Sequence, residues 1–212
     1  MRTLVIETAT AACSVALIED GRVIDHAHDV VGRGHAEKLV PMIAALDGGG
    51  RADRILVDCG PGSFTGIRVG LAAARGLAFG WQVPVAGFQS LALVAAAALA
   101  AHDLAEVCVV LEGGHGEVFV QRFAADLTPL APAASRKPDA ALADLAGRTA
   151  VGNGVHRLTA LAPDLPVIEA LPDAAEAHRL PPAQADLPPR PIYGRAPDAK
   201  PPTPRPALGV AA

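Results

Sequence analysis

The sequence predicts an α/β protein of two related lobes, each built on a mixed β-sheet with helices, and with a reduced second lobe. The first half of the chain reads as three strands followed by helices that alternate with strands, the order of an α/β unit. Residues 107–123 then repeat the plan of the opening hairpin, an apolar strand that ends in Glu, a short turn and an alternating strand. We therefore expect an N-terminal lobe over 1–104, a smaller lobe over 105–180 and a Pro-rich tail over 181–212, partly docked near Tyr193.

The first lobe opens with a predicted meander of strands over 3–8, 13–18 and 23–29. Asp20-Gly21 lies between the second and third strands, and this pair suits the positive φ angles of a tight hairpin turn. Apolar residues at helical spacing then predict a helix over 35–46.

The centre of this lobe is a predicted strand over 55–58, a glycine loop at 60–62 and a helix over 65–80. Ser63 or Thr65 can cap the helix by accepting a bond from a backbone N–H group. The later predicted elements are, in order, a strand at 83–86, a helix at 90–101 capped by Ser90, strands at 107–112 and 117–123, a helix at 138–146, a strand at 149–151, a short helix after Gly154 and a strand at 167–168.

Small residues recur at every fourth position of the central loop and helix, at Gly62, Gly66, Gly70, Ala74 and Ala78. Residues four apart share one helix face, and glycine inside a helix costs about 1 kcal/mol relative to alanine. The stripe therefore indicates the close approach of another backbone. That backbone can belong to the helix's own sheet or to a helix of another chain. A third interpretation, an anion cradle at the helix start, lacks the Gly-Lys-Ser/Thr sequence of phosphate loops.

Composition narrows the functional classes. The formal charge is −4 and no basic block is present, which argues against autonomous tight binding to nucleic acid. The 3 cysteines are far apart and form no Cys-x-x-Cys pair, as is typical of reduced thiols in a cytoplasmic protein. We expect no signal peptide, and the longest apolar run, 91–101, is too short to span a bilayer.

No complete catalytic or metal site is evident in the sequence. Ser63 lies outside a Gly-x-Ser-x-Gly elbow, so we interpret it as a cap. His35 and Glu37 do not form a His-Glu-x-x-His zinc helix because the second histidine is missing, and we interpret them as a cap or a surface pair.

Several motifs together resemble those of one family. They are Ile6-Glu-Thr-Ala-Thr10, Cys13-Ser-Val-Ala-Leu17, residues 35–41, Gly60-Pro-Gly-Ser-Phe-Thr-Gly-Ile-Arg-Val-Gly70 with Gly76-Leu-Ala78, Gly116-Glu-Val-Phe119 and, in the tail, Tyr193-Gly-Arg195-Ala-Pro-Asp198-Ala-Lys200. On these motifs the chain resembles the TsaB (YeaZ) family of the bacterial machinery that makes N6-threonylcarbamoyladenosine in tRNA. The match is dense in the first half of the chain and sparse in the second.

This resemblance implies an actin-like (ASKHA, ribonuclease H-like) fold and a subunit without catalysis of its own. Its partner would be a TsaD-like homologue that transfers the threonylcarbamoyl group, with a TsaE-like ATPase in the complex and a TsaC-like enzyme supplying the activated intermediate. The resemblance also implies a homodimer in isolation, contact with tRNA only through the complex, and no membrane. The family pairs through two helices of the N-terminal lobe, which gives as interface candidates His35, Glu37, Leu39, Met42, Gly62, Ser63, Thr65, Gly66, Arg68, Val69, Gly70 and Ala74. We expect a bulky residue at Gly70 to block pairing and leave folding intact.

In actin-like folds, acids at strand ends and the neighbouring hairpin tips organise metal and phosphate. The resemblance therefore implies Glu7, Thr8, Thr10 and Glu112 as candidate nucleotide contacts. Neither tip contains a lysine, so we expect no intrinsic cofactor or metal, and ADP or ATP only at the junction with the partner. Glu7 stands where Asp is common in the family, and Glu112-Gly-Gly-His115 replaces Asp-Ala-Arg.

Two other functions compete with the assembly subunit. A small ATPase or a glycoprotease-like peptidase would need a metal or an activated nucleophile. An extracellular growth-factor module would need an export signal, which we do not find.

Overall fold

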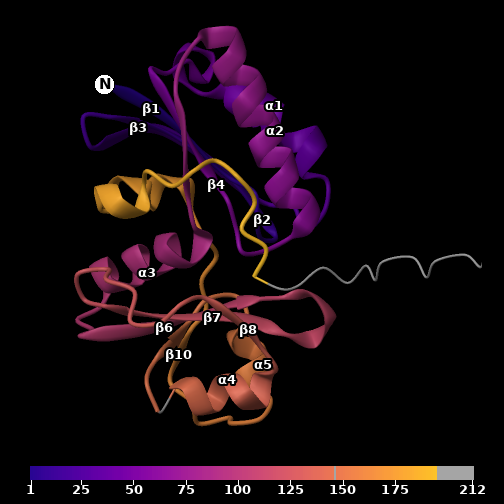
Figure 1. The fold of residues 1–212 in the computed structure, drawn as a ribbon, viewed down its shortest axis with the longest axis vertical. Helices are drawn as coiled ribbons and strands as arrows, with labels where there is room; N and C mark the ends of the chain where they lie inside the picture. Colours follow the sequence, from indigo (N-terminus) through magenta and orange to yellow (C-terminus); the bar gives the residue numbers. More distant parts are fainter. Residues whose placement is uncertain (146, 195–212) are drawn as a thin grey trace, which may run out of the picture.

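The computed structural model describes residues 1–145 and 147–194, which stack in alternating layers of helix and sheet. Helices α1 and α2 cover the first sheet, α3 lies between the two sheets, and α4 and α5 cover the far side of the second (Figure 1). The helices are α1 (His35–Ala45), α2 (Phe64–Trp81), α3 (Ser90–Ala101), α4 (Pro138–Leu145) and α5 (Val155–Thr159). Among the described residues, no helix combines the length and the hydropathy needed to cross a bilayer.

The two sheets have the same plan, which confirms the prediction of two related lobes. The first has the order β3-β2-β1-β4-β5, and the second, read from the opposite edge, β8-β7-β6-β9-β10. In each, the central strand runs antiparallel to the next strand of the chain and parallel to a later one. The strands are β1 (Arg2–Glu7), β2 (Ala12–Glu19), β3 (Arg22–Val30), β4 (Arg54–Asp58), β5 (Val85–Phe88), β6 (Glu106–Glu112), β7 (Val118–Ala124), β8 (Ala134–Arg136), β9 (Ala150–Val151) and β10 (Val167–Ile168).

The second lobe is the smaller one, as the sequence predicts. Its strands β9 and β10 have 2 residues each, and its outer helices α4 and α5 have 8 and 5 residues, against 11 and 18 in α1 and α2. The sequence analysis missed β8, which takes the place of β3 in the second sheet. Its three residues are too few to show an alternating pattern.

Two predicted boundaries are corrected by the structure. The fifth strand begins at Val85, two residues later than predicted, and pairs with β4 in parallel. Ser90 does not cap α3 but is its first residue, after Gln89. Its backbone N–H donates to Asp58 Oδ1 at 2.9 Å, so the cap is supplied by a strand of the first sheet.

Helix α3 is apolar on all sides, and both sheets bury it. Most of its residues from Ser90 to Ala98 are buried. Its side chains belong to one hydrophobic cluster with Val5 and Leu56 of the first sheet and with Val109 and Phe119 of the second. A helix of this kind is stable only inside a protein core, so its burial fixes the two lobes against each other.

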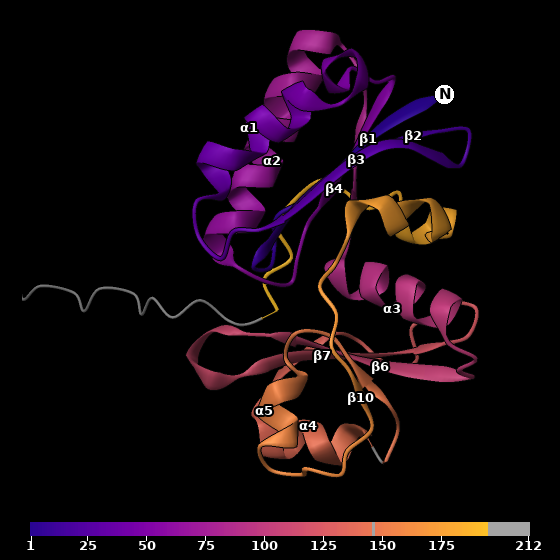
Figure 2. The same cartoon turned by 180° about the vertical axis from the view of Figure 1, so that it is seen from behind.

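After the second sheet the chain returns to the first lobe. The 3₁₀ segment η3 (Ala174–Arg179) lies beside α3 on the inner face of the first sheet (Figure 2). Ser14 of β2 is the anchor for this segment, because its hydroxyl donates to Asp173 Oδ1 at 3.1 Å and accepts from the Ala174 N–H group at 2.9 Å.

The Pro-rich segment that follows is docked on the first lobe over its described residues. Leu187 pairs with Gly87 of β5, the Arg75 guanidinium donates to the carbonyl of Pro189, and the Ile192 N–H group donates to the carbonyl of Cys59. Proline lacks an N–H group but keeps its carbonyl, so a Pro-rich strand can dock as an acceptor. The remaining residues of the tail, 195–212, lie outside the described part of the chain.

The position of α3 leads to a first prediction. Leu93 is fully buried in the cluster shared by both lobes, so we expect Leu93→Ala to lower the free energy of unfolding by about 2–5 kcal/mol. Urea unfolding followed by circular dichroism should show one cooperative transition at lower urea. Leu130→Ala is the matched control, because this leucine is 46% exposed and should change the midpoint little. Two separate transitions in the Leu93 variant would contradict a core shared by the lobes.

Candidate functional site

The start of α2 is built as the sequence predicts. Ser63 is the N-cap residue, and its hydroxyl accepts a bond from the Gly66 N–H group at 3.2 Å. Thr65 is the alternative cap, but it lies inside the first turn and is exposed to solvent. The Ser63 hydroxyl is therefore engaged in helix capping.

The stripe of small residues on α2 faces this chain's own first sheet. A Cβ atom at Gly62 would overlap the carbonyl oxygen of Ala9, and one at Gly66 would overlap that of Thr8. A Cβ at Gly70 would lie 2.5 Å from the hydroxyl of Thr8, which donates to the carbonyl of Gly66 at 2.8 Å. The glycines are needed because the turn between β1 and β2 meets the helix backbone directly.

This packing corrects the interpretation of the stripe as a seat for a helix of another chain. Gly66, Gly70 and Ala74 are buried beneath the chain's own residues, so these three cannot meet a partner, and the half-buried Gly62 packs on Ala9. The expectation that a bulky residue at Gly70 leaves folding intact is wrong for the same reason.

Helix α1 also buries two of the predicted interface residues. Leu39 is fully buried, and His35 is buried with its Nε2 atom 3.0 Å from the carbonyl oxygen of Ala12. His35 is therefore neither a helix cap nor half of a surface pair, and it joins α1 to β2. The candidates that remain at the surface are Glu37, Ser63, Thr65 and Arg68, which are exposed, and Met42, Gly62 and Val69, which are half-buried.

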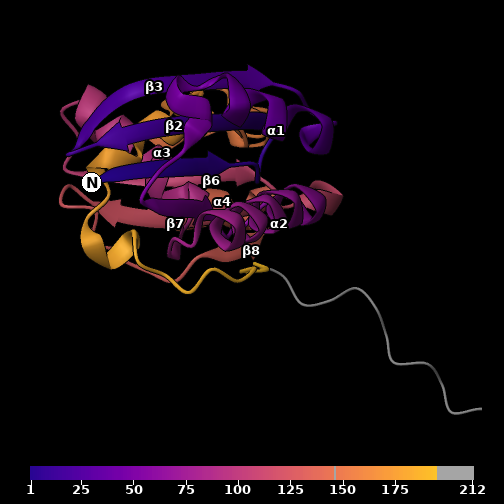
Figure 3. The same ribbon diagram turned by 90° about the horizontal axis from the view of Figure 1, so that it is seen from above.

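The outer surfaces of α1 and α2 carry exposed apolar residues that the sequence analysis did not single out. Phe79 of α2 is 89% exposed and Val40 of α1 is 56% exposed. The outward side of α2 also contains the small residues Ala72 and Gly76, and no atom lies within 4 Å of a Cβ placed at Gly76. We call the exposed residues of these two helices the outer helical face. Figure 3 shows the two helices from above, beside the strands of the first sheet.

An aromatic cluster lies at one end of this face. The Arg68 guanidinium lies 3.5 Å from the centroid of the Phe64 ring, and its Nε–H group donates to the hydroxyl of Tyr193 at 3.1 Å. The two rings are 5.2 Å apart, and Phe64 and Tyr193 remain 53% and 44% exposed. The chain's single tyrosine thus docks the tail on α2, as the sequence predicts.

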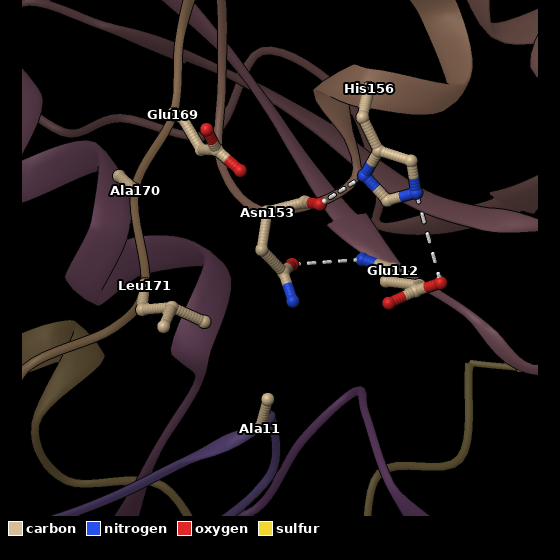
Figure 4. Close-up of a pocket in the computed structure, with 7 residues that line it drawn as sticks. All are labelled: Ala11, Glu112, Asn153, His156, Glu169, Ala170 and Leu171. Atoms are coloured by element: carbon tan, nitrogen blue, oxygen red, sulfur yellow. Dashed lines mark hydrogen bonds and ion pairs between the residues drawn. The ribbon is translucent and has the colours of Figure 1, made fainter. Parts of the chain in front are cut away.

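A pocket of about 430 Å³ lies between the lobes, lined by Ala11, Glu112, Asn153, His156, Glu169, Ala170 and Leu171 (Figure 4). Glu112 Oε1 accepts from Arg157 at 2.5 Å, and the Glu112 N–H group donates to Asn153 Oδ1 at 3.0 Å. His156 Nδ1 lies 2.8 Å from the carbonyl oxygen of Asn153. The pocket is therefore lined by two carboxylates, that of Glu169 and that of Glu112, which is paired with Arg157.

The residues predicted as nucleotide contacts do not come together in this pocket. Only Glu112 lines it. Glu7 and Thr8 are fully buried in the first lobe, and Thr10 Oγ1 accepts from the Ala12 N–H group at 3.2 Å. Glu7, Thr8 and Thr10 serve the fold in this structure, and a nucleotide contact made by the set Glu7, Thr8, Thr10 and Glu112 stays a prediction. Across residues 1–145 and 147–194, no group of three or more His, Cys, Asp and Glu side chains is arranged to hold a metal ion.

The thiols are not placed for nucleophilic chemistry. Cys13, Cys59 and Cys108 are all buried. Burial raises the pKa of Cys13 to about 11 and the pKa values of Cys59 and Cys108 to about 12, so all three stay protonated at neutral pH.

Helix α2 has glycines that pack on the turn between β1 and β2, such as Gly66, and a glycine that faces open space, Gly76. This difference gives a second prediction. Gly66→Ala places a methyl group against the Thr8 carbonyl and should lower the free energy of unfolding by roughly 3 kcal/mol. Gly76→Ala is the matched control, because its Cβ meets open space and should stabilise the helix by up to about 1 kcal/mol. Urea denaturation of both variants measures the difference. Equal effects would mean that the turn between β1 and β2 does not constrain α2.

The thiol environments give a third prediction. In native protein at pH 8, we expect a thiol reagent such as DTNB to label none of the three cysteines within minutes, because each is buried and protonated. In urea, all three should react at once. Fast labelling of the native protein would contradict the burial of the thiols.

The chain is similar to known proteins of one family. A family model described as TsaD, tRNA N6-adenosine threonylcarbamoyltransferase, matches residues 29–175. The tRNA threonylcarbamoyladenosine biosynthesis protein TsaB of Escherichia coli is 36% identical over 131 residues, 59% of this chain and 56% of that protein. TsaB of Haemophilus influenzae is 38% identical over 55% of this chain and 51% of that protein. The chain thus spans about half the length of these two curated relatives.

Other similar proteins match over nearly the whole chain. An uncharacterized protein of Mycobacterium tuberculosis is 32% identical over 93% of both chains. A crystal structure of a Pseudomonas aeruginosa protein, described as similar to peptidase YEAZ, has 26% identity and a TM-score of 0.74, and covers 92% of this chain and 99% of that one. YeaZ from Pseudomonas aeruginosa has 25% identity and a TM-score of 0.73, over 91% and 99% of the two chains. These matches confirm the predicted fold class.

Proposed function

Because this chain belongs to the TsaB (YeaZ) family, we propose that it is a non-catalytic subunit in the synthesis of N6-threonylcarbamoyladenosine in tRNA. Its partner would be a TsaD-like transferase, with which it forms a heterodimer in the cytoplasm. A TsaE-like ATPase would join the complex, and tRNA would be contacted only through it. In isolation, the same surface would pair two copies of this chain.

The observation that carries the proposal is the outer helical face. Phe79 and Val40 expose most of their side chains to solvent, and burying this apolar surface against another protein would be favourable. Gly76 has no packing role within the described chain, although glycine weakens a helix. Both features are explained if a partner helix packs closely on α2 at Ala72 and Gly76.

The aromatic cluster supports the same placement. Phe64, Arg68 and Tyr193 are held together by the stacking and the hydrogen bond described above, yet they stay partly exposed. Pre-ordered aromatic and arginine side chains are typical of the residues that contribute most to binding. In this proposal they form the polar end of the pairing surface, together with Ser63 and Thr65.

The environments of the reactive groups favour a role without catalysis. The Ser63 hydroxyl caps a helix, and the three thiols are buried and protonated. In the interlobe pocket, the Glu112 carboxylate is already paired with Arg157. Any ADP or ATP would then bind at the junction with the partner.

The alternative function, a small ATPase or a glycoprotease-like peptidase, has one point in its favour, the peptidase named in the description of a similar structure. ATP turnover and peptide hydrolysis by the isolated chain, with and without added Mg²⁺ or Zn²⁺, distinguish the two functions. We expect no turnover above that of a heat-inactivated sample. Metal-dependent turnover that copurifies with the folded chain would overturn the non-catalytic role.

The pairing proposal leads to a fourth prediction. We expect Phe79→Asp to reduce copurification with the TsaD-like homologue of the same cell at least tenfold, because it places a charge in an apolar interface. Leu161→Asp is the matched control on the second lobe, where the leucine is 57% exposed and pairing should be retained. Circular dichroism should show both variants folded. Undiminished pairing by the Phe79 variant, or equal loss in the control, would reject the outer helical face as the interface.

A further inference from the structure

Two acids are buried side by side in the interlobe core. Glu7 ends β1 and Asp58 ends β4, and these strands are parallel neighbours, so both side chains reach the same edge of the sheet. Glu7 is fully buried and Asp58 is 1% exposed. Ser90, the first residue of α3, is fully buried beside them and interacts with both carboxyl groups.

Hydrogen bonds satisfy only one oxygen of each carboxyl group. Asp58 Oδ1 accepts from the N–H groups of Gly60 at 3.1 Å and Ser90 at 2.9 Å. Glu7 Oε1 accepts from the Ala9 N–H group at 2.7 Å. Within the described chain, Glu7 Oε2, Asp58 Oδ2 and Ser90 Oγ have no partner of standard geometry. Three orphaned polar atoms at one buried place are unfavourable unless something joins them.

We propose that Glu7 and Asp58 hold one proton between them in the folded protein, with Glu7 as the carboxylic acid and Asp58 as the carboxylate. A proton on Glu7 turns one of two opposed acceptors into a donor, so that Glu7 Oε2 can bond Asp58 Oδ2. Asp58 is the better place for the negative charge, because it accepts two N–H bonds, one of them at the start of α3.

The surroundings of the pair agree with this assignment. Helix α3 and strand β5 contain no ionisable side chain. The ionisable neighbours are the thiols of Cys13 and Cys59, and Asp173, which accepts from Ser14 opposite Glu7 in β2. Asp173 Oδ2 in turn lies 3.7 Å from His28 Nδ1. The basic residues Lys38 and Arg75 act on the thiols of Cys13 and Cys59.

The proton on this pair makes the stability of the folded protein depend on pH in a defined direction. Burial and the neighbouring Asp58 raise the pKa of Glu7 well above its usual value, and burial also raises the pKa of Asp58. Above about pH 4.5 the unfolded chain therefore holds fewer protons than the folded chain, and folding becomes less favourable as pH rises. The proton shared by Glu7 and Asp58 contributes its full stabilisation below about pH 4.5. This contribution decreases as the pH rises, and it is lost once the pH passes the raised pKa of the pair. The joint of β1, β4 and α3 is thus a pH-sensitive contact.

Urea unfolding between pH 5 and pH 9 tests this inference. For the wild type, we expect the unfolding constant to rise by up to about tenfold per pH unit until the proton is released. In Glu7→Gln the amide replaces the protonated acid and can donate to Asp58, so this contribution to the slope should disappear. Glu169→Gln is the matched control, an exposed glutamate that should keep the wild-type slope. A wild-type slope in Glu7→Gln would overturn the proposal.

A spectroscopic measurement keeps the proposal testable if the variant does not fold. Infrared spectra of the full chain with ¹³C-labelled glutamate side chains should show a protonated carboxyl band at pH 7, where exposed glutamates are ionised. Absence of this band in the wild type would overturn the proposal. So would stability at pH 8 that depends on Mg²⁺ at constant ionic strength, because a cation would then replace the proton.

Discussion

The burial of α3 between the two sheets is the constraint on which the rest of the structure depends. This helix has no polar side to expose, and its side chains join residues of both sheets in one hydrophobic cluster. The lobes are therefore held together by a shared core. The returning segment around Asp173 and Ala174 adds hydrogen bonds from the far end of the second lobe to Ser14. Such a body is suited to act as a rigid support.

Helix α2 packs on the first lobe with one face and exposes the other to solvent, and the two faces have different roles. Its inner face must accommodate the turn between β1 and β2, and only glycine at 62, 66 and 70 leaves room for the carbonyl and hydroxyl groups of that turn. Its outer face has no such neighbour, but it still carries exposed Phe79 and an unexplained Gly76. The inner face belongs to the folding of this chain, and the outer face is the part of the helix available to another protein.

The polar residues at the strand ends of the first sheet connect this sheet to its neighbouring helices. In this chain, Glu7 and Asp58 lie inside the core and cap the joint between the first sheet and α3. Thr8 closes the contact with α2 through its hydroxyl. At this edge the Thr8 hydroxyl, Glu7 Oε1 and Asp58 Oδ1 all make hydrogen bonds to the protein's own backbone.

The sequence by itself determined the order of the elements, the relation between the two lobes, the cap at Ser63 and the docking of Tyr193, because each follows from spacing or turn chemistry between near neighbours. It also located the backbone contact of α2 without identifying the other backbone. Only the tertiary structure decided that this contact is internal, that His35 and Glu7 are buried, and that Phe79 is exposed. The physical reason is that a helical pattern fixes which residues share a face, whereas the neighbour of that face is set by packing between segments far apart in the chain.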